Sequence, residues 1–236
     1  MTKPHKPQEY WNENIDKWGK LYLEISHSHE NLNAPAWLGF LYKQIIVPLE
    51  ARLMTERYRL TMSFIDRYVR EGITVVDVGC GTGIFTVEML RRGARVKAVD
   101  FAQSSLNLTK SLVEELVPEK SANVDYLLMD VSKQHLPDSD VVLAMGVTPY
   151  LDRIAPFYDN ILPTTKTFYC LILDSGHWAN RIRSVLTFLN VRNMHWFSRT
   201  EIDSIVARHN WQLIERKSFA SGYLDLVQKK EHGHIE

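Results

Sequence analysis

A glycine-rich segment is the part of the sequence best suited to bind a small ligand. It reads Asp77-Val78-Gly79-Cys80-Gly81-Thr82-Gly83 and follows an apolar run. A strand that ends in such a turn lets the backbone approach a nucleotide-like ligand closely, because glycine has no Cβ. A dinucleotide-binding turn would need a third glycine where Ile84 stands, and no Gly-Lys-Ser/Thr of a P-loop follows. Glycines that only close a turn are the alternative.

Two further acidic residues follow the next two apolar runs. Asp100 comes after 95–99, and Asp130 comes after 124–129. Carboxyl ends of parallel strands meet at one edge of a sheet, so Asp77, Asp100 and Asp130 are expected to line the edge where ligands bind. An acid after the second strand can accept hydrogen bonds from ribose hydroxyls, whereas capping of the next helix is its purely structural alternative.

These residues resemble motif I and the following acidic positions of the class I S-adenosylmethionine-dependent methyltransferases. The resemblance covers about 73–174 well and 198–227 more loosely. It implies S-adenosyl-L-methionine as the methyl donor and S-adenosyl-L-homocysteine as the product. It also implies that Asp130 contacts the adenine amino group and that Met145 lies at the methionine end of the cofactor. The predicted cofactor-binding residues are Asp77, Val78, Gly79, Cys80, Gly81, Gly83, Asp100, Phe101, Met129, Asp130, Val131, Met145 and Trp18.

Short apolar runs that alternate with amphipathic stretches must position these residues. Such alternation predicts βαβ units, and therefore an α/β fold. The expected fold is a Rossmann-like, doubly wound, mostly parallel seven-stranded sheet with an antiparallel edge hairpin and an N-terminal helical extension. The expected strands are 73–78, 95–99, 124–129, 141–145, 167–173, 211–215 and 223–227, and the last two are separated by Ser221-Gly222.

The chain is expected to divide into two parts. Residues 1–70 have a helical, aromatic pattern and are predicted to form a cap or substrate region, in which Trp18 either closes over the cofactor or belongs to the core. Residues 71–236 are predicted to form the S-adenosylmethionine-binding domain, with a lid insertion at about 175–197. The alternation of apolar runs and amphipathic stretches resumes at Ser198 and Glu201, which form a capping-box pattern for the next helix.

Methyl transfer from a sulfonium is an in-line displacement, so aligning the acceptor matters more than acid–base chemistry. An oxygen acceptor with a high pKa would still need a general base. The candidates are Tyr150, His177 and His195, each of which has a packed or solvated side chain as its alternative. Arginines at 181, 183 and 192 would bind an acidic acceptor or form a solvated helix face.

Composition narrows the classes of partner. The 28 basic residues equal the 28 acidic ones, so nucleic acid is a disfavoured acceptor. Two cysteines, Cys80 and Cys170, form neither a disulfide framework nor a zinc site, and no metal is predicted. No secretory signal or apolar run of membrane-spanning length occurs, which favours a soluble, cytoplasmic protein.

The expected function is methylation of an oxygen or nitrogen atom of a small molecule. A protein or RNA acceptor, and a non-catalytic cofactor-binding protein, are the alternatives.

Overall fold

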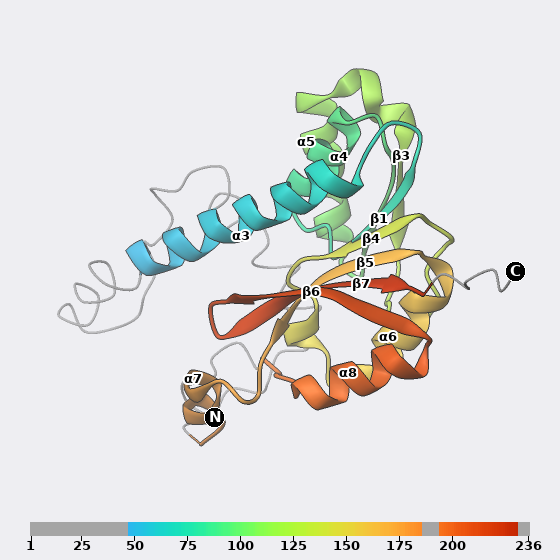
Figure 1. Cartoon of the computed structure of the whole chain (residues 1–236). Coiled ribbons are helices and arrows are strands. Elements are labelled where there is room, and N and C mark those ends of the chain that lie inside the picture. The colour runs from blue at the N-terminus through green and yellow to red at the C-terminus, as the bar shows by residue number, and fades with distance from the viewer. Residues whose placement is uncertain (1–46, 186–193, 231–236) are drawn as a thin grey trace, which may run out of the picture.

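The sheet has seven strands in the order β3-β2-β1-β4-β5-β7-β6. The computed structural model describes residues 47–185 and 194–230 (Figure 1). The first five strands of that order run parallel to their neighbours, whereas β7 is antiparallel to both β5 and β6. Their bounds are β1 Thr74–Val78, β2 Arg95–Asp100, β3 Val124–Leu128, β4 Val141–Ala144, β5 Thr167–Leu173, β6 Trp211–Phe219 and β7 Gly222–Lys229.

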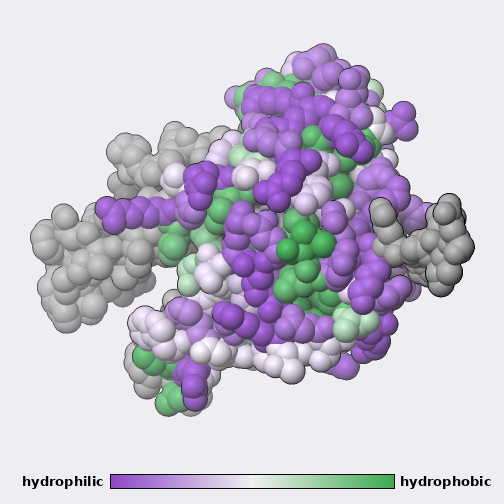
Figure 2. Space-filling model, viewed as in Figure 1, coloured by the Kyte–Doolittle hydropathy of each residue, from purple (hydrophilic) through white to green (hydrophobic). Residues whose placement is uncertain are grey.

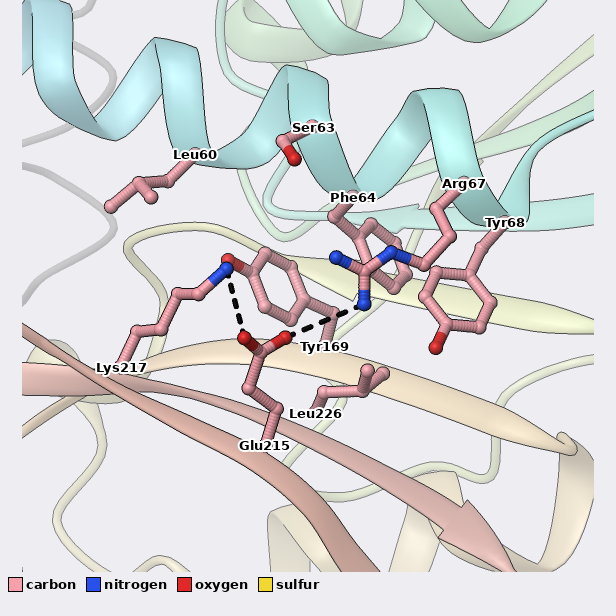
Figure 3. Close-up of a pocket in the computed structure, with 9 residues that line it drawn as sticks. All are labelled: Leu60, Ser63, Phe64, Arg67, Tyr68, Tyr169, Glu215, Lys217 and Leu226. Atoms are coloured by element: carbon pink, nitrogen blue, oxygen red, sulfur yellow. Dashed lines mark ion pairs between the residues drawn. The ribbon is translucent and has the colours of Figure 1, made fainter.

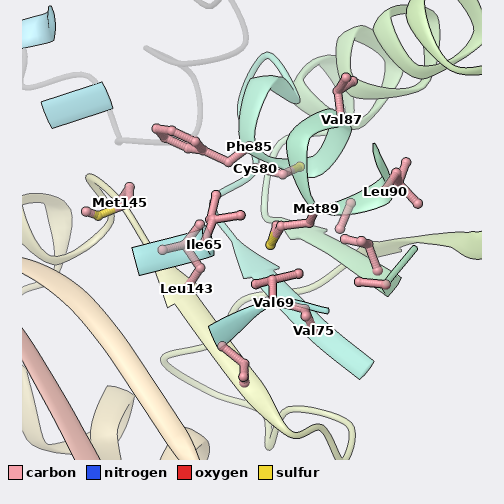
Figure 4. Close-up of a cluster of buried hydrophobic side chains, with 14 of the residues drawn as sticks. Ile65, Val69, Val75, Cys80, Phe85, Val87, Met89, Leu90, Leu143 and Met145 are labelled. Carbon is pink, nitrogen blue, oxygen red and sulfur yellow. The ribbon is translucent and has the colours of Figure 1, made fainter. Parts of the chain in front are cut away.

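Helices cover both faces of the sheet. On one face, α3 (Val47–Tyr68), α4 (Ile84–Arg91) and α5 (Gln103–Leu116) bury their apolar sides against β1 and β2. Figure 4 shows part of this cluster, including Ile65 of α3, Val75 of β1 and Met89 of α4. On the other face, α6 (Ala155–Ile161) and α8 (Arg199–Arg208) pack against β4, β5 and β7. Val75 belongs to the first cluster and Val76 to the second, because successive strand side chains point to opposite faces. Shorter elements are η2 Pro118–Asn123, η3 Thr148–Tyr150, η4 Leu162–Thr164 and α7 Trp178–Val185.

The predicted fold class is confirmed, including the antiparallel hairpin at the edge. All seven expected strands are present, and the strand over 167–173 has the predicted bounds. The hairpin strands are longer than expected: β6 continues to Phe219 and β7 to Lys229. The division into residues 1–70 and 71–236 remains a prediction, since 1–46 lie outside the described residues. The described part of that extension, α3, contributes Leu60, Phe64 and Ile65 to the same core as β1.

The edge strand β6 carries a bulge. Leu213 pairs with Val227 and Glu215 pairs with Leu226, so Ile214 has no partner residue on β7. Such an extra residue bends a strand and increases its twist. After the bulge, Arg216 extends to Asp225 on β7 and Asp203 on α8, and thereby ties the helix to the hairpin.

A shallow groove separates α3 from the hairpin (Figure 3). At its base the rings of Phe64 and Tyr169 stack at 4.3 Å between centroids. On the β6 side of the groove, Glu215 pairs with Arg67 at 3.5 Å and with Lys217 at 2.9 Å. These contacts join α3 to the β6 edge of the sheet. None of the helices among the described residues is long and apolar enough to cross a membrane.

Candidate functional site

The glycine-rich loop between β1 and α4 adopts a conformation that only glycine tolerates well. Gly79, Gly81 and Gly83 have φ angles of 68°, 58° and 86°. The amide of Gly79 donates to the carbonyl of Val99 at 2.7 Å, which fastens the loop to β2. A Cβ on Gly83 would lie 2.8 Å from Thr109 Cα, so a side chain there would also collide with α5. The loop is therefore compact and backbone-lined, as close approach to a ligand requires.

Asp100 lies beside this loop at the carboxyl end of β2. It is 6% exposed, and its carboxylate accepts hydrogen bonds from the amides of Gly81 at 3.2 Å and Ala102 at 2.9 Å. Burial raises the pKa of Asp100, while the hydrogen bonds from Ala102, Gly81 and Ser105 act in the opposite direction. The carboxylate thus fixes the glycine loop relative to the start of α5, and further donors would stabilise its charged form.

Asp77 has a local role that the sequence pattern did not reveal. Its carboxylate accepts a hydrogen bond of 2.6 Å from the Thr86 hydroxyl in the first turn of α4. Gly83 is the N-cap residue of α4 and has no side chain with which to cap it. The Asp77 side chain on β1 supplies that function instead, because it also accepts a hydrogen bond from the backbone amide of Thr86. The sequence feature that could have indicated this role is the glycine at the N-cap position of α4. A direct contact of Asp77 with the cofactor remains a prediction.

We expect the Asp77→Asn variant to lose less stability than the wild type as the pH rises. The pKa of Asp77 is raised to about 7, mainly by burial. The hydrogen bonds from Thr86 act in the opposite direction, and the nearby charge of Asp100 adds to the rise. The unfolded value is about 4, so between these pH values the folded chain keeps a proton that the unfolded chain loses, and the free energy of unfolding decreases as pH rises. From about pH 6 to about pH 8 this group accounts for a loss of about 1.4 kcal/mol.

Urea unfolding of the wild-type and variant chains at the two pH values measures this loss. The exposed Asp125 on β3 provides the matched control, since its asparagine variant should keep the wild-type dependence on pH. An Asp77→Asn chain that loses as much stability as the wild type over this range would contradict the assignment.

Asp130 lies after β3, and its carboxylate already has partners. One oxygen accepts from the amide and hydroxyl of Ser132 at 3.0 and 2.6 Å, and the other pairs with Lys133 at 2.7 Å. Burial raises the pKa of Asp130, but the contacts with Lys133 and Ser132 outweigh it and the pKa is lowered. The carboxylate is therefore charged at neutral pH. Its predicted contact with an adenine amino group would compete with the exposed Lys133 ammonium.

The remaining predicted cofactor residues lie in three places. Val78 is the last residue of β1, and Met145 directly follows β4; both side chains are buried. Phe101 directly follows Asp100, and Met129 and Val131 flank Asp130 on the adjacent strand end. The Cys80 thiol is buried in the loop beside Thr109, and burial raises its pKa well above the usual range, so it stays protonated. Trp18 lies outside the described residues.

The candidate base His177 serves as a helix cap. Its Nδ1 accepts a hydrogen bond of 3.2 Å from the amide of Ala179, within the first turn of α7. That bond requires Nδ1 to be unprotonated. The ring also lies against Trp178, with 5.7 Å between the ring centroids. The purely structural alternative for His177 therefore has direct support.

The other two candidate bases belong to segments that the structure brings together. The amide of His195 donates to the carbonyl of Pro149 at 2.7 Å, directly before Tyr150 in η3. The His195 ring nitrogen Nε2 lies 3.4 Å from Asp152. This cluster follows β4 and so shares the sheet edge with the glycine loop, where Val147 would touch a Cβ on Gly79 at 2.3 Å.

Arg57 is a charged residue at this edge that sequence reasoning missed. Its Nη1 lies 3.4 Å from where a Cβ on Gly146 would stand, just after Met145. The pKa of Arg57 is lowered to about 10 because burial disfavours its charged form, and this outweighs the opposite effect of Tyr150. Nothing in the helical pattern of α3 distinguishes Arg57 from the solvated arginines around it.

The predicted anion-binding arginines are only partly described. Arg181 lies on α7 with an exposed side chain, whereas Arg192 and the side chain of Arg183 lie outside the described residues. Across residues 47–185 and 194–230, no group of three or more His, Cys, Asp or Glu side chains could hold a metal ion.

Comparison with known proteins shows which proteins this chain resembles. Residues 75–166 match the family described as a methyltransferase domain. The chain is 40% identical over 79 residues to magnesium-protoporphyrin O-methyltransferase of Rhodobacter capsulatus, covering 34% of each protein. It is 40% identical over 174 residues to ribosomal protein L11 methyltransferase of Thermotoga maritima, covering 73% of this chain and 56% of the relative.

Solved structures support the fold. Magnesium protoporphyrin IX methyltransferase of Synechocystis with bound S-adenosylhomocysteine superposes with a TM-score of 0.67 at 13% identity, covering 94% of this chain and 97% of the other. The first curated relatives are matched over 34% to 63% of their own length. Residues 75–166 thus match a methyltransferase domain family, and the chain has the fold of the class I S-adenosylmethionine-dependent methyltransferases.

Proposed function

We propose that this chain is an enzyme that transfers a methyl group from S-adenosylmethionine to an oxygen or nitrogen atom of a small-molecule acceptor. The observation that carries the proposal is the buried Asp100 carboxylate, which fixes the amides of Gly81 and Ala102 at the rim of the glycine loop. This arrangement lies inside the segment that matches the methyltransferase domain family.

The residues at the sheet edge suit this donor chemically. Asp100 offers charged acceptors for ribose hydroxyls, Asp130 offers them for an amino group, and the glycine turn lets the backbone approach the ligand closely. S-adenosylmethionine supplies a methyl group on a positively charged sulfur. The chain has to hold that donor, align the acceptor and exclude water.

The acceptor side is proposed to lie beyond Met145, where β4 ends. Tyr150 and His195 come from segments joined by the His195–Pro149 hydrogen bond, and either could take a proton from a hydroxyl acceptor. Arg57 at Gly146 places a guanidinium at the same edge, which suits an acceptor with an acidic group. The lid at about 175–197 and the N-terminal region would enclose this space.

A protein acceptor is the second candidate. It is favoured by the likeness to the Thermotoga ribosomal protein L11 methyltransferase, which covers more of this chain than the likeness to the protoporphyrin enzyme does. The equal numbers of basic and acidic residues favour neither class of acceptor.

Calorimetric titration and transfer of labelled methyl groups test the proposal together. We expect S-adenosylhomocysteine to bind with a one-to-one stoichiometry at the glycine loop that precedes α4. We expect label from S-adenosylmethionine to enter small phenols, carboxylates or amines from a mixed panel. Label incorporated only into ribosomal protein would favour the second candidate, and absence of binding at millimolar cofactor would contradict both.

A further inference from the structure

Helix α3 carries Arg57 to the edge of the sheet at which the candidate site lies. Phe64 of this helix stacks on Tyr169 of β5, with 4.3 Å between the ring centroids. About two turns earlier, the Arg57 Nη1 atom lies 3.4 Å from where a Cβ on Gly146 would stand, beyond the carboxyl end of β4. The side of α3 that covers the sheet therefore places a guanidinium group just past the ends of the strands.

The residue next to Arg57 fixes this part of α3 against the helix that follows the glycine loop. The Tyr58 ring stacks on Phe85, in the first turn of α4, with 5.9 Å between the ring centroids. The turn after β4 lies against the same loop, because a Cβ on Gly79 would be 2.3 Å from Val147. Arg57 thus belongs to the junction at which α3, the glycine loop and the turn after β4 meet.

The surroundings of Arg57 favour an anionic ligand. Its Nε atom is buried, and burial lowers the pKa of the guanidinium to about 10 although Tyr150 acts in the opposite direction. An anion in contact with the guanidinium would stabilise its charged form. The planar guanidinium can offer two parallel N–H donors, and the two oxygens of a carboxylate accept them together. A carboxylate is therefore the group that suits this position best.

We propose that Arg57 binds a carboxylate of the methyl acceptor and thereby selects acceptors that carry one. This role rests on the proposed function, which places the acceptor beyond Met145. The bound carboxylate would be a second group of the acceptor and not the atom that receives the methyl group, because its oxygens accept the guanidinium protons. The guanidinium would hold one end of the acceptor while a separate hydroxyl or amino group faces the donor. Arg57 would then be a specificity-determining residue.

Titration of benzoate and benzamide into the complex of the full chain with S-adenosylhomocysteine tests the proposal. The two probes have nearly the same shape, but only benzoate carries a charge. We expect the wild-type complex to bind benzoate at least about tenfold more tightly than benzamide, as a charge-assisted pair provides. Arg57→Gln should remove this preference. Arg57→Lys should keep part of it, because lysine retains the charge but not the two parallel donors.

Arg59→Gln is the matched control. Hydrophilic side chains project from the outward side of α3 (Figure 2), and the exposed Arg59 pairs there with Glu56 at 2.6 Å, so this variant should bind both probes as the wild type does. A wild-type chain that does not bind S-adenosylhomocysteine would contradict the proposed function and, with it, the role of Arg57. Cofactor binding without a preference for benzoate would overturn the role of Arg57 alone. So would a folded Arg57→Gln chain that keeps the wild-type preference.

Discussion

Replacing Asp100 with alanine is expected to lower the affinity for S-adenosylhomocysteine by at least about a hundredfold. Hydrogen bonds to a charged acceptor contribute about 1.5–3 kcal/mol each, and two ribose hydroxyls would lose theirs. The amides of Gly81 and Ala102 would also lose the carboxylate that holds the loop in its binding conformation. Isothermal titration calorimetry measures the change directly.

A second variant and a control keep this prediction decisive. Asp100→Asn preserves the size of the buried side chain but removes its charge, so it should fold and still bind clearly more weakly than the wild type. Asp125→Ala removes an exposed carboxylate on the neighbouring strand and should leave the affinity unchanged. Wild-type affinity in a folded Asp100→Asn chain would contradict the assignment of the ribose site.

Replacing Arg216 with alanine is expected to destabilise the fold by about 3–5 kcal/mol, because a buried carboxylate would lose its cation. Asp225 is fully buried in β7, and Arg216 contacts its two oxygens at 2.7 Å each. Burial holds the pKa of Asp225 above its ordinary value despite this partner. The guanidinium also lies 4.4 Å above the Tyr223 ring. Urea unfolding followed by circular dichroism measures the loss.

Two comparisons separate this effect from a general loss of surface charge. Arg208 pairs with Asp159 at the surface, and Arg208→Ala should cost less than about 1 kcal/mol. The double variant Arg216→Met, Asp225→Leu removes both charges together and should recover most of the stability lost in Arg216→Ala. A single Arg216→Ala variant as stable as Arg208→Ala would show that the buried pair does not tie α8 to the hairpin.

The strands could be predicted because their sequence pattern reflects burial on both faces. The apolar runs at β1, β4 and β5 are covered by helices on each side, and a continuous apolar run is what such a position selects. The second half of β6 was missed for the opposite reason. Arg216, Lys217 and Ser218 belong to an edge strand, where a polar side chain fits as well as an apolar one, so no pattern distinguishes strand from loop.

The candidate site was predictable in its backbone and less so in its side chains. The loop glycines and Asp100 follow from the order of strands and turns. The bond from Asp77 to Thr86 depends on which way a side chain turns inside the core. The approach of His195 to Pro149 joins segments 46 residues apart in the chain, and a single sequence carries no record of such a contact.

The bulge at Ile214 bears on how the molecule avoids edge-to-edge association with other copies of itself. An edge strand with free amides and carbonyls is a template on which another chain can add a strand, and exposed Leu213 and Ile214 would make that addition favourable. The unpaired residue twists the edge, and the charges of Glu215 and Lys217 follow it directly. Growth of the sheet from one molecule to the next would therefore be interrupted at a position remote in sequence from the glycine loop.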